Sequence, residues 1–320
     1  MTEIQNYQKT GYLTGDFRIF HLKDSSGPDF SYHYHSFDKI LILLSGNVSY
    51  RIEGRSYRLA PYDVVFVRHN DIHKPEVDFS VPYERIIAYI APGFLAAQTA
   101  GETGNEGTGT EDAGNGDLSL CFARMKASGS DVFRLEAGSP VMPAVSALAA
   151  SLSDTGYAHA LYSRLIFLEF MVLLNRAVLK NQAAYPEASG SNPRIQELLA
   201  YVNTHLGEDL SVELLAGKFY FSRYHLMRTF KKETGCTLAG YIQEKRLLMA
   251  RERIQSGVPA MEAAMECGYR DYSAFAKAFR HKFQAPPSHF GPDSHFNLDS
   301  DFGSDSRLDP DSHFDLDSRL

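Results

Sequence analysis

The sequence predicts a multidomain chain: an N-terminal all-β barrel with a helical extension, followed by an all-α domain that contains two helix-turn-helix motifs. Short strand-like runs separated by turn residues fill residues 39–90, and the periodicity becomes helical after residue 142. A helical pattern is then nearly duplicated after residue 194. With 320 residues, 44% of them hydrophobic, the chain is long enough for two or three domains with packed cores.

The barrel strands are predicted from a two-residue periodicity. After the apolar run 40–44 and a Ser-Gly-Asn turn, Val48, Tyr50 and Ile52 alternate with polar neighbours. Turn residues then separate three further expected strands, at 56–59, 64–67 and 85–90. Many short strands at close spacing are typical of a small barrel or sandwich.

The helical extension is predicted from an apolar stripe between residues 142 and 180. Leu161, Leu165, Leu168 and Val172 recur at positions i, i+4, i+7 and i+11, which places them on one face of a helix. Such a stripe has to be covered. It either packs on the barrel of its own chain or forms a subunit interface, and the sequence leaves both open.

Changes in composition give the domain limits. Residues 100–117 are rich in Gly, Thr, Glu and Asn, residues 183–193 contain Pro, Ser and Gly, and the C-terminal end repeats the motifs DSHF and DSRL among eight aspartates. We therefore expect a barrel over 1–95, a disordered low-complexity insertion over 96–118, a helical extension and candidate dimerisation segment over 119–182, a linker over 183–192, a double helix-turn-helix domain over 193–291, and a disordered acidic tail without assigned role over 292–320.

The near-duplication carries the functional prediction. A short helix with Ala216 precedes a helix with Leu226 and Phe230, and a short helix with Ala264 precedes a helix with the pair Phe275 and Phe279. Small alanines allow two helices to approach closely, and each apolar i, i+4 pair anchors the second helix. Ser211, Ser222, Gly235 and Gly257 are the expected caps and stops of these helices.

Charge and geometry together make DNA a candidate ligand of this domain. The whole chain has a net charge of −7, but residues 193–291 hold 14 Lys and Arg against 10 Asp and Glu. Two helices joined by a rigid central helix match a major groove that recurs about every 34 Å on one face of DNA. The alternative is a plain helical bundle whose duplication is accidental, which the composition alone favours.

The motifs decide between these alternatives. The segments LSVELLAGKFYFSRYHLMRTFKKETGCTLAGYIQEKRLLMARERI and CGYRDYSAFAKAFRHKFQAPPSHF resemble the AraC/XylS-type DNA-binding domain of bacterial transcription regulators, from about Arg194 to Phe290. The sequence departs from the family pattern at Ala263, where a larger aliphatic residue is usual, and at Gln284, where glycine is usual.

The resemblance implies which side chains face DNA. The groove-facing set on the two recognition helices comprises Arg223, Tyr224, Met227, Arg228, Tyr272, Ser273, Ala276 and Lys277. Arg228 and Lys277 have cationic donors suited to guanine or phosphate. Four further cations are expected to contact phosphates and set the register: Lys231, Lys232, Arg280 and Lys282.

The barrel resembles the cupin fold, because His33-x-His35 is followed by a series of strands and by His73. In metal-binding cupins two such histidines, a glutamate shortly after and a later histidine surround one ion. Here Lys39 stands at the glutamate position and opposes a divalent cation, and Asp38 is expected to point to the opposite face. We therefore predict no metal and no cofactor.

These barrel residues have two remaining interpretations. His33, His35, Lys39 and His73 could together bind the oxygens of a small effector, as barrel sensors of this family often bind a sugar. Alternatively, His35 and His73 are core histidines whose hydrogen bonds are satisfied by the backbone. Three dispersed cysteines without a CxxC pattern, and the lack of a signal peptide or membrane segment, predict a cytoplasmic protein.

The resemblance implies a sequence-specific transcription regulator, expected to be an activator that responds to a small-molecule effector and not an enzyme. Its expected partners are promoter DNA, the effector, RNA polymerase and a second copy of the chain, without a membrane. Two rivals stay open. One is a constitutive DNA-binding protein whose barrel only dimerises, and the other is a metal-dependent cupin enzyme.

Overall fold

The computed structural model describes residues 8–9, 13, 15–27, 30–98, 117–136, 138–180, 183–188 and 192–292. The chain divides into two compact units, and the main division falls between residues 189 and 190. Most of the predicted insertion, residues 99–116, and the predicted tail from residue 293 lie outside the described residues. No helix among those that are described is both long enough and apolar enough to span a bilayer.

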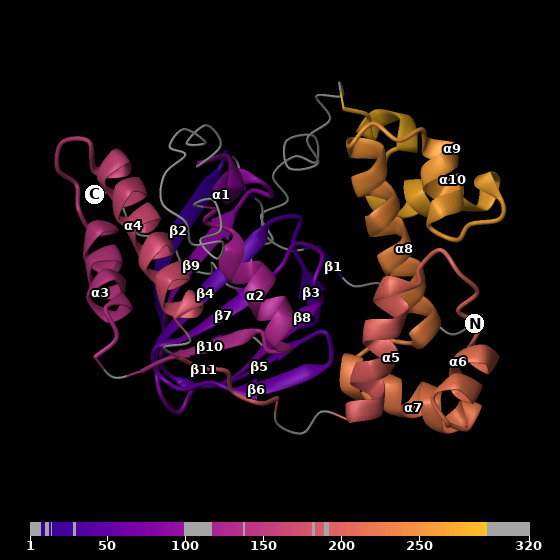
Figure 1. Cartoon of the computed structure of the whole chain (residues 1–320), viewed down its shortest axis with the longest axis horizontal. Coiled ribbons are helices and arrows are strands. Elements are labelled where there is room, and N and C mark those ends of the chain that lie inside the picture. The colour runs from indigo at the N-terminus through magenta and orange to yellow at the C-terminus, as the bar shows by residue number, and fades with distance from the viewer. Residues whose placement is uncertain are drawn as a thin grey trace, which may run out of the picture. The chain divides into compact units, whose positions relative to one another are not determined.

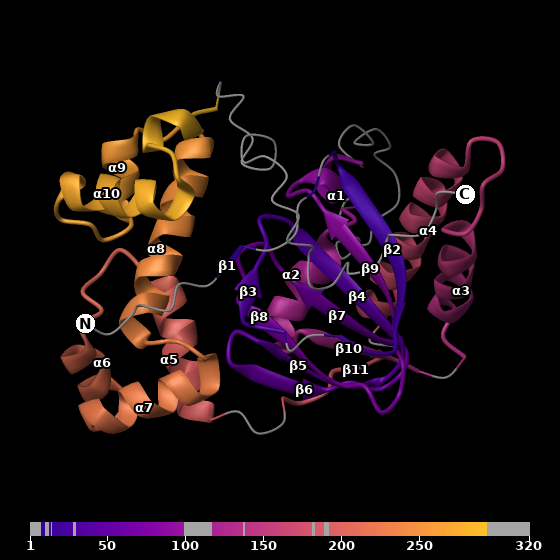
Figure 2. The ribbon, with the colours of Figure 1, turned by 180° about the vertical axis from the view of Figure 1, so that it is seen from behind.

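The first unit is built on two antiparallel sheets (Figure 2). One has the strand order β1-β3-β8-β5-β6 and the other β11-β10-β7-β4-β9-β2. The strands are β1 (Gln8–Lys9), β2 (Phe17–Asp24), β3 (His33–Tyr34), β4 (Asp38–Ser45), β5 (Asn47–Ile52), β6 (Arg55–Arg58), β7 (Asp63–Val67), β8 (His73–Asp78), β9 (Tyr83–Ile90), β10 (Val132–Leu135) and β11 (Ala183–Ala184). The five strands expected from periodicity are confirmed within one or two residues at their ends, and the sequence patterns did not single out β2 or β8.

The barrel core lies between the two sheets. Leu41 and Leu43 of β4 pack there with Tyr50 of β5, whereas Ile40 and Ile42 belong to a second apolar cluster. This separation follows from the two-residue period of a strand, which sends successive side chains to opposite faces. One strand therefore contributes to both cores of the unit.

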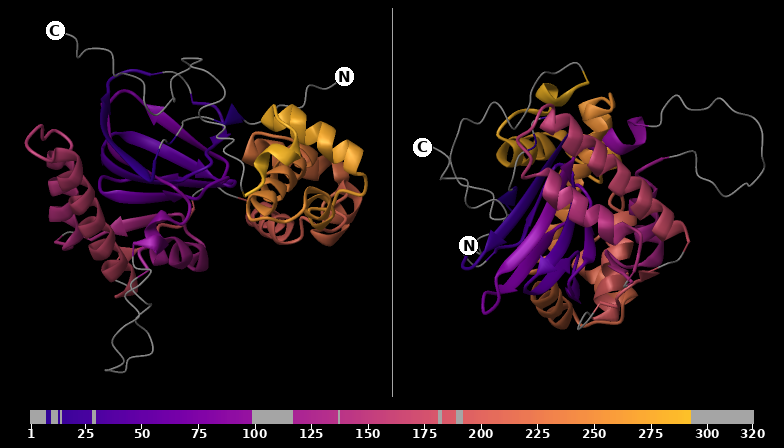
Figure 3. Two further views of the ribbon diagram at one scale, coloured as in Figure 1. Left: turned by 90° about the horizontal axis from the view of Figure 1, so that it is seen from above. Right: turned by 90° about the vertical axis from the view of Figure 1, so that its left-hand side faces the viewer.

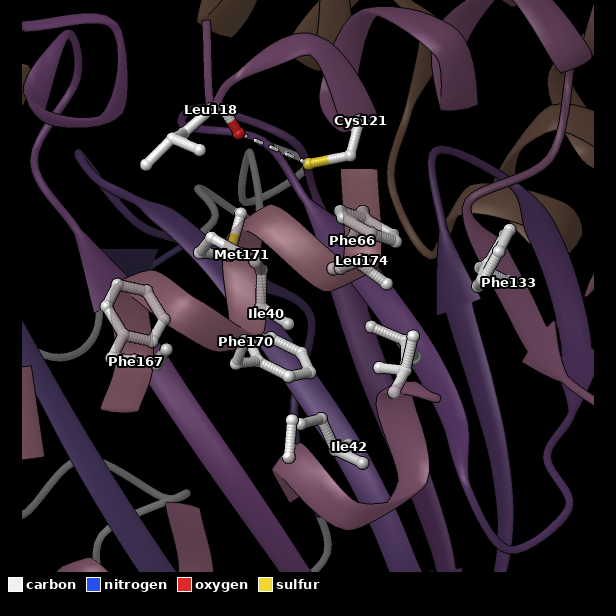
Figure 4. Close-up of a cluster of buried hydrophobic side chains, with 14 of the residues drawn as sticks. Ile40, Ile42, Phe66, Leu118, Cys121, Phe133, Phe167, Phe170, Met171 and Leu174 are labelled. Atoms are coloured by element: carbon white, nitrogen blue, oxygen red, sulfur yellow. Dashed lines mark hydrogen bonds between the residues drawn. The ribbon is translucent and has the colours of Figure 1, made fainter. Parts of the chain in front are cut away.

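Helices cover the outer face of the larger sheet and complete the second core (Figures 3 and 4). They are α1 (Phe94–Ala97), α2 (Leu120–Ser128), α3 (Val141–Ser151) and α4 (His159–Leu179). Figure 4 shows Phe170 and Leu174 of α4 beside Ile40, Ile42 and Phe66 of the sheet, all of which are buried. Burial of such aromatic and aliphatic side chains fixes the helix on the sheet.

The predicted stripe on α4 is covered only in part by its own chain, because Leu168 and Val172 pack against the second core as partly buried residues. The hydrophobic residues that α4 buries are Phe167, Phe170, Met171, Leu174, Ala177 and Val178, whereas Leu161 and Leu165 are 56% and 55% exposed. The segment from residue 165 to 174 is almost continuously apolar, so it offers two competing stripes. Contact with the sheet selects the stripe with the larger aromatic and sulfur-containing side chains.

The helical extension is also less separate than predicted. Within residues 119–182, strand β10 pairs with β7 of the barrel, with Val132 opposite Val65. The first two residues of the predicted linker form β11 and pair with β10. A four-residue strand between helices has too short a pattern to be recognised locally, and only its pairing with a distant strand defines it.

The second unit consists of helices with two equivalent pairs at opposite ends of α8 (Figure 1). The elements are α5 (Pro193–Thr204), α6 (Val212–Lys218), α7 (Arg223–Thr234), α8 (Leu238–Gln255), α9 (Ala260–Glu266), α10 (Tyr272–Phe283) and the short 3₁₀ helix η1 (Pro287–Phe290). The predicted N-caps are confirmed, because the Ser211 and Ser222 hydroxyls accept from the backbone N–H groups of Leu214 and His225.

Candidate functional site

The two helix pairs of the second unit share one backbone motif. In the α6–α7 unit the N–H of Phe221 donates to the carbonyl of Ala216 at 2.9 Å, and in the α9–α10 unit Tyr269 donates to Ala264 at 3.0 Å. Both alanines are buried, at 4% and 2% exposure, where a larger side chain would push the helices apart. The duplication found in the sequence is therefore a structural one.

Buried anchors hold each second helix in place. Leu226 and Phe230 of α7 and Phe275 and Phe279 of α10 are all 0% exposed. Because side chains four residues apart lie on the same face of a helix, this arrangement leaves the opposite face of both helices to solvent. The prediction that these four residues belong to the core is confirmed.

The predicted groove-facing residues of α7 lie on its solvent side. Tyr224 and Met227 are 72% and 44% exposed, and Arg228, Lys231 and Lys232 are exposed cations. Arg223 is also exposed and forms an ion pair with Glu213 at 2.7 Å. An exposed pair of this kind contributes little to stability, so the guanidinium can exchange its carboxylate for a phosphate.

The corresponding residues of α10 are also placed toward solvent, with two exceptions. Tyr272, Ser273, Lys277 and Arg280 are exposed, whereas Ala276 is half-buried. Lys282 differs further, as its ammonium lies 2.5 Å from the carboxylate of Glu244 on α8, and the two side chains are only 10% and 5% exposed.

The expectation that Lys282 contacts phosphate does not fit this arrangement. Burial raises the pKa of Glu244, and the ammonium of Lys282 partly offsets that effect. Removing Lys282 would take away the cation that contacts this buried carboxylate, which is costly in a core. Lys282 therefore fixes α10 to α8, and the cations of this predicted set that remain exposed are Lys231, Lys232 and Arg280.

Arg246 of α8 is a residue that the sequence patterns did not single out. Its Nε donates to the carbonyl of Leu206 at 2.8 Å and an Nη donates to the carbonyl of Glu208 at 2.6 Å, in the loop before α6. A Cβ on Gly268, in the α9–α10 turn, would lie 2.8 Å from the same guanidinium and 2.7 Å from the oxygen of Leu206. Arg246 thus lies where the two helix pairs meet and helps to fix their relative orientation.

In the first unit, the structure brings the predicted effector-binding residues together inside the barrel. His33 on β3 is paired directly with His73 on β8, and their ring centroids lie 4.2 Å apart. The ring of His35 lies 5.1 Å and 4.8 Å from these two. All three histidines and Lys39 are at most 1% exposed.

Backbone carbonyls orient two of the imidazoles. The Nδ1–H of His33 donates to Ser31 at 2.8 Å, and that of His73 donates to Asp71 at 3.0 Å. Burial, and then the charges of His33, His35 and Lys39, hold the pKa of His73 well below its ordinary value of 6.5. Its ring is therefore neutral at pH 7, with a lone pair on Nε2.

Lys39 and its neighbour Asp38 point to opposite sides of β4, as expected. The Asp38 carboxylate accepts hydrogen bonds from the backbone and the Nδ1 of His69, both at 2.8 Å. The ammonium of Lys39 lies 5.9 Å and 6.0 Å from the ring centroids of Tyr50 and Tyr89. Aromatic faces stabilise a cation at such distances, which helps to hold a lysine in the barrel core.

A barrel with a buried polar cluster, followed by two helix-turn-helix units on one connecting helix, defines a DNA-binding protein with a ligand-binding domain. Residues 19–162 match the AraC-like ligand binding domain, and residues 215–291 match the helix-turn-helix domain family. This chain belongs to the AraC/XylS family of transcription regulators.

Individual relatives agree with this assignment. The transcriptional activator RhaS of Klebsiella pneumoniae is 25% identical over 266 residues, which cover 81% of this chain and 86% of RhaS. The regulatory protein SoxS of Escherichia coli is 33% identical over 97 residues, 30% of this chain and 91% of SoxS. These relatives are regulators, which confirms the prediction that the chain is a regulator and not an enzyme.

Proposed function

We propose that this regulator reads promoter DNA with α7 and α10 and changes its DNA occupancy when a small molecule binds in its barrel. The observation that carries the proposal is the pair of equivalent helices, each anchored by buried residues on one face and exposing cationic and aromatic side chains on the other. The family assignment supports DNA binding as the general activity.

The proposed DNA contacts divide by chemistry. Arg228 and Lys277 are long, exposed donors suited to guanine O6 and N7. Lys231, Lys232 and Arg280 contact phosphates and set the register of the two helices. Met227 and the half-buried Ala276 offer apolar contact to bases. The remaining exposed residues of the predicted set also face the groove: Arg223, Tyr224, Tyr272 and Ser273.

The proposed effector site comprises His33, His35, Lys39 and His73. Imidazole nitrogens and an ammonium can bind hydroxyl or carboxylate oxygens, and the side chains come from strands of both sheets. Similarity to the family, and to RhaS over most of the chain, supports a sugar as one effector class to test.

A second copy of the chain is the proposed partner of the exposed side of α4. Leu161, Tyr162 and Leu165 of α4 are 56%, 47% and 55% exposed, and Tyr157, which precedes the helix, is 102% exposed. This is an unusual concentration of large apolar side chains at one helix end. We place the dimeric regulator in the cytoplasm, where it activates transcription through RNA polymerase at the promoters it binds.

The test of the DNA-binding proposal is selection of bound sequences from a random DNA pool with the full chain. We expect a motif of two half-elements about one helical turn apart, because α7 and α10 enter successive segments of the major groove. The double variant Arg228→Ala, Lys277→Ala serves as the control and should lose the selected motif. Recovery of no sequence preference by the wild-type chain would overturn the proposal.

The effector proposal is tested by thermal unfolding of the full chain with a panel of sugars and small carboxylates. A compound that binds the folded barrel raises the melting temperature in proportion to its concentration. The effect should disappear in the His33→Gln variant. A panel without any such compound would favour the rival interpretation, in which the barrel only dimerises and DNA binding is constitutive.

A further inference from the structure

The three barrel histidines converge more closely than recognition of a large effector requires. One ligand nitrogen from each of His33, His35 and His73 can be chosen so that all three lie within 4.8 Å of one another. Tetrahedral zinc with Zn–N distances of about 2.0–2.1 Å places its ligand nitrogens about 3.4 Å apart. Binding of an ion would require rotations of the rings that close this difference.

The hydrogen bonds of the cluster fix which nitrogens face inward. His33 and His73 each use Nδ1 to donate to the carbonyl two residues earlier, which leaves Nε2 as the acceptor of a neutral ring. Metal-bound histidines commonly have this arrangement, in which the second nitrogen donates to a carbonyl or carboxylate and orients the ring. The Nε2 of His73 is fully buried and has no hydrogen-bond partner among the described residues.

Chemistry favours an ion over a hydroxyl group as the common ligand of these nitrogens. One hydroxyl group donates one hydrogen and can satisfy one imidazole lone pair, whereas a metal ion accepts all three lone pairs together. Size favours it as well, since all three histidines are at most 1% exposed. An ion requires only the space between the rings, and it leaves a fourth coordination position for an oxygen of the effector.

We propose that His33, His35 and His73 form a binding site for a divalent transition-metal ion of the zinc class, coordinated through Nε2 and open at a fourth position. Lys39, which from the sequence argues against a cation, lies beside Tyr50 and Tyr89 and gives this site a charge partner for an anionic fourth ligand. Among the described residues no carboxylate belongs to the histidine group, so that ligand would be the carboxylate of an effector.

The proposal of a metal site is argued from the histidine geometry and does not depend on the proposed function. Only an effect of the metal on DNA occupancy rests on the proposed function. Calorimetric titration of the chelator-treated full chain with ZnCl₂ should show one ion per chain, with MgCl₂ giving no binding because Mg²⁺ prefers oxygen ligands. Titration with CoCl₂ should give the visible absorption bands of nitrogen-coordinated cobalt. A wild-type chain that binds neither zinc nor cobalt stoichiometrically would overturn the proposal.

Variants separate this site from adventitious binding. His73→Gln should weaken zinc binding more than tenfold, since loss of an outer-shell partner alone costs about 10- to 100-fold. The matched control is His21→Gln, which removes a surface histidine paired with Glu84 and should bind zinc as the wild type does. Equal zinc affinity of His73→Gln and wild type would show that the ion binds elsewhere.

A variant that binds zinc more tightly provides a second test, because misfolding explains a loss of zinc affinity but not a gain. Lys39→Met removes a buried positive charge near the ion, so zinc affinity measured without added carboxylate should rise. Unchanged or weaker zinc binding by a folded Lys39→Met variant would contradict the placement of the ion beside Lys39. Selection of DNA by the zinc-free chain is measured in parallel, because failure of metal binding with retained DNA selection overturns the metal site alone.

Discussion

The two helix-turn-helix units use the same backbone conformation with exchanged residue types. Each turn needs one residue with positive φ, which is Tyr220 (φ 56°) in the α6–α7 unit and Gly268 (φ 83°) in the α9–α10 unit. The helices α7 and α10 each end in a left-handed residue as well, which is Gly235 after α7 and Gln284 after α10. Glycine thus occupies the helix cap in the α6–α7 unit and the turn in the α9–α10 unit.

Available space explains the exchange at the turn. Tyr220 is 87% exposed, so its side chain points away from its neighbours despite the cost of a left-handed conformation. At Gly268 a Cβ would lie 2.7 Å from the carbonyl oxygen of Leu206. The motif therefore dictates the backbone at both turns. Only the α9–α10 turn needs glycine, because it packs against the loop before α6.

The largest effects are expected at the shared anchors. Phe230→Ala and Phe279→Ala should each lower the free energy of unfolding by about 3–5 kcal/mol, because both rings are fully buried. Urea unfolding of the full chain, with hydrogen exchange of peptides from α7 and α10, would locate each loss. A cost below about 1 kcal/mol at either position would show that the two units are not equivalent.

Substitution at the turn should affect the stability of the two helix-turn-helix units very differently. Gly268→Ala should cost about 1–3 kcal/mol, since it combines a strained φ with a clash against Leu206 and Arg246. Tyr220→Ala is the matched change in the other turn and should stay within about 0.5 kcal/mol, as expected for an exposed residue. If urea unfolding showed equal losses of stability for Gly268→Ala and Tyr220→Ala, the space around each turn would not explain the choice of residue.

On DNA, the comparison is between Arg228 and Lys277. Replacing either by alanine should weaken binding to the selected motif by about 1–3 kcal/mol and relax the base preference in its own half-element. Lys231→Ala should instead weaken binding to all DNA sequences alike. It should also reduce the salt dependence of the binding constant by the amount expected for about one phosphate contact. Fluorescence anisotropy at several salt concentrations measures both effects. Wild-type affinity of the Arg228→Ala and Lys277→Ala variants would overturn the assignment of the recognition helices.

The smallest effect is expected at the helix ends. Gln284→Gly should raise stability by about 0.5 kcal/mol, because relief of the left-handed strain is partly offset by the flexibility of glycine. The Gln284 amide also donates to the carbonyl of His281 at 2.8 Å, and the variant loses this bond. Gly235→Ala at the other cap should lower stability. Urea unfolding that shows the opposite signs would indicate that the left-handed caps are not under the expected strain.

The sequence predicted the helical unit better than the sheet unit. Helix caps such as Ser211 and Ser222 and the anchors Phe230 and Phe279 are local signals, separated by a few residues along the chain. The sequence left open which side of α4 packs on its own sheet, because a helix in a long apolar run has no local preference for one stripe over another. Strand β10 was missed because only its partner β7, more than sixty residues away, defines it.

The sequence by itself determined the duplicated helix pairs, their family and the four polar residues of the barrel, because caps, spacing and residue types are properties of the chain. Only the tertiary structure decided that Lys282 pairs with Glu244, that Arg246 lies between the helix pairs, and that three imidazole nitrogens lie within 4.8 Å of one another. These relations depend on distances between residues far apart in sequence, which are set when the strands and helices pack together.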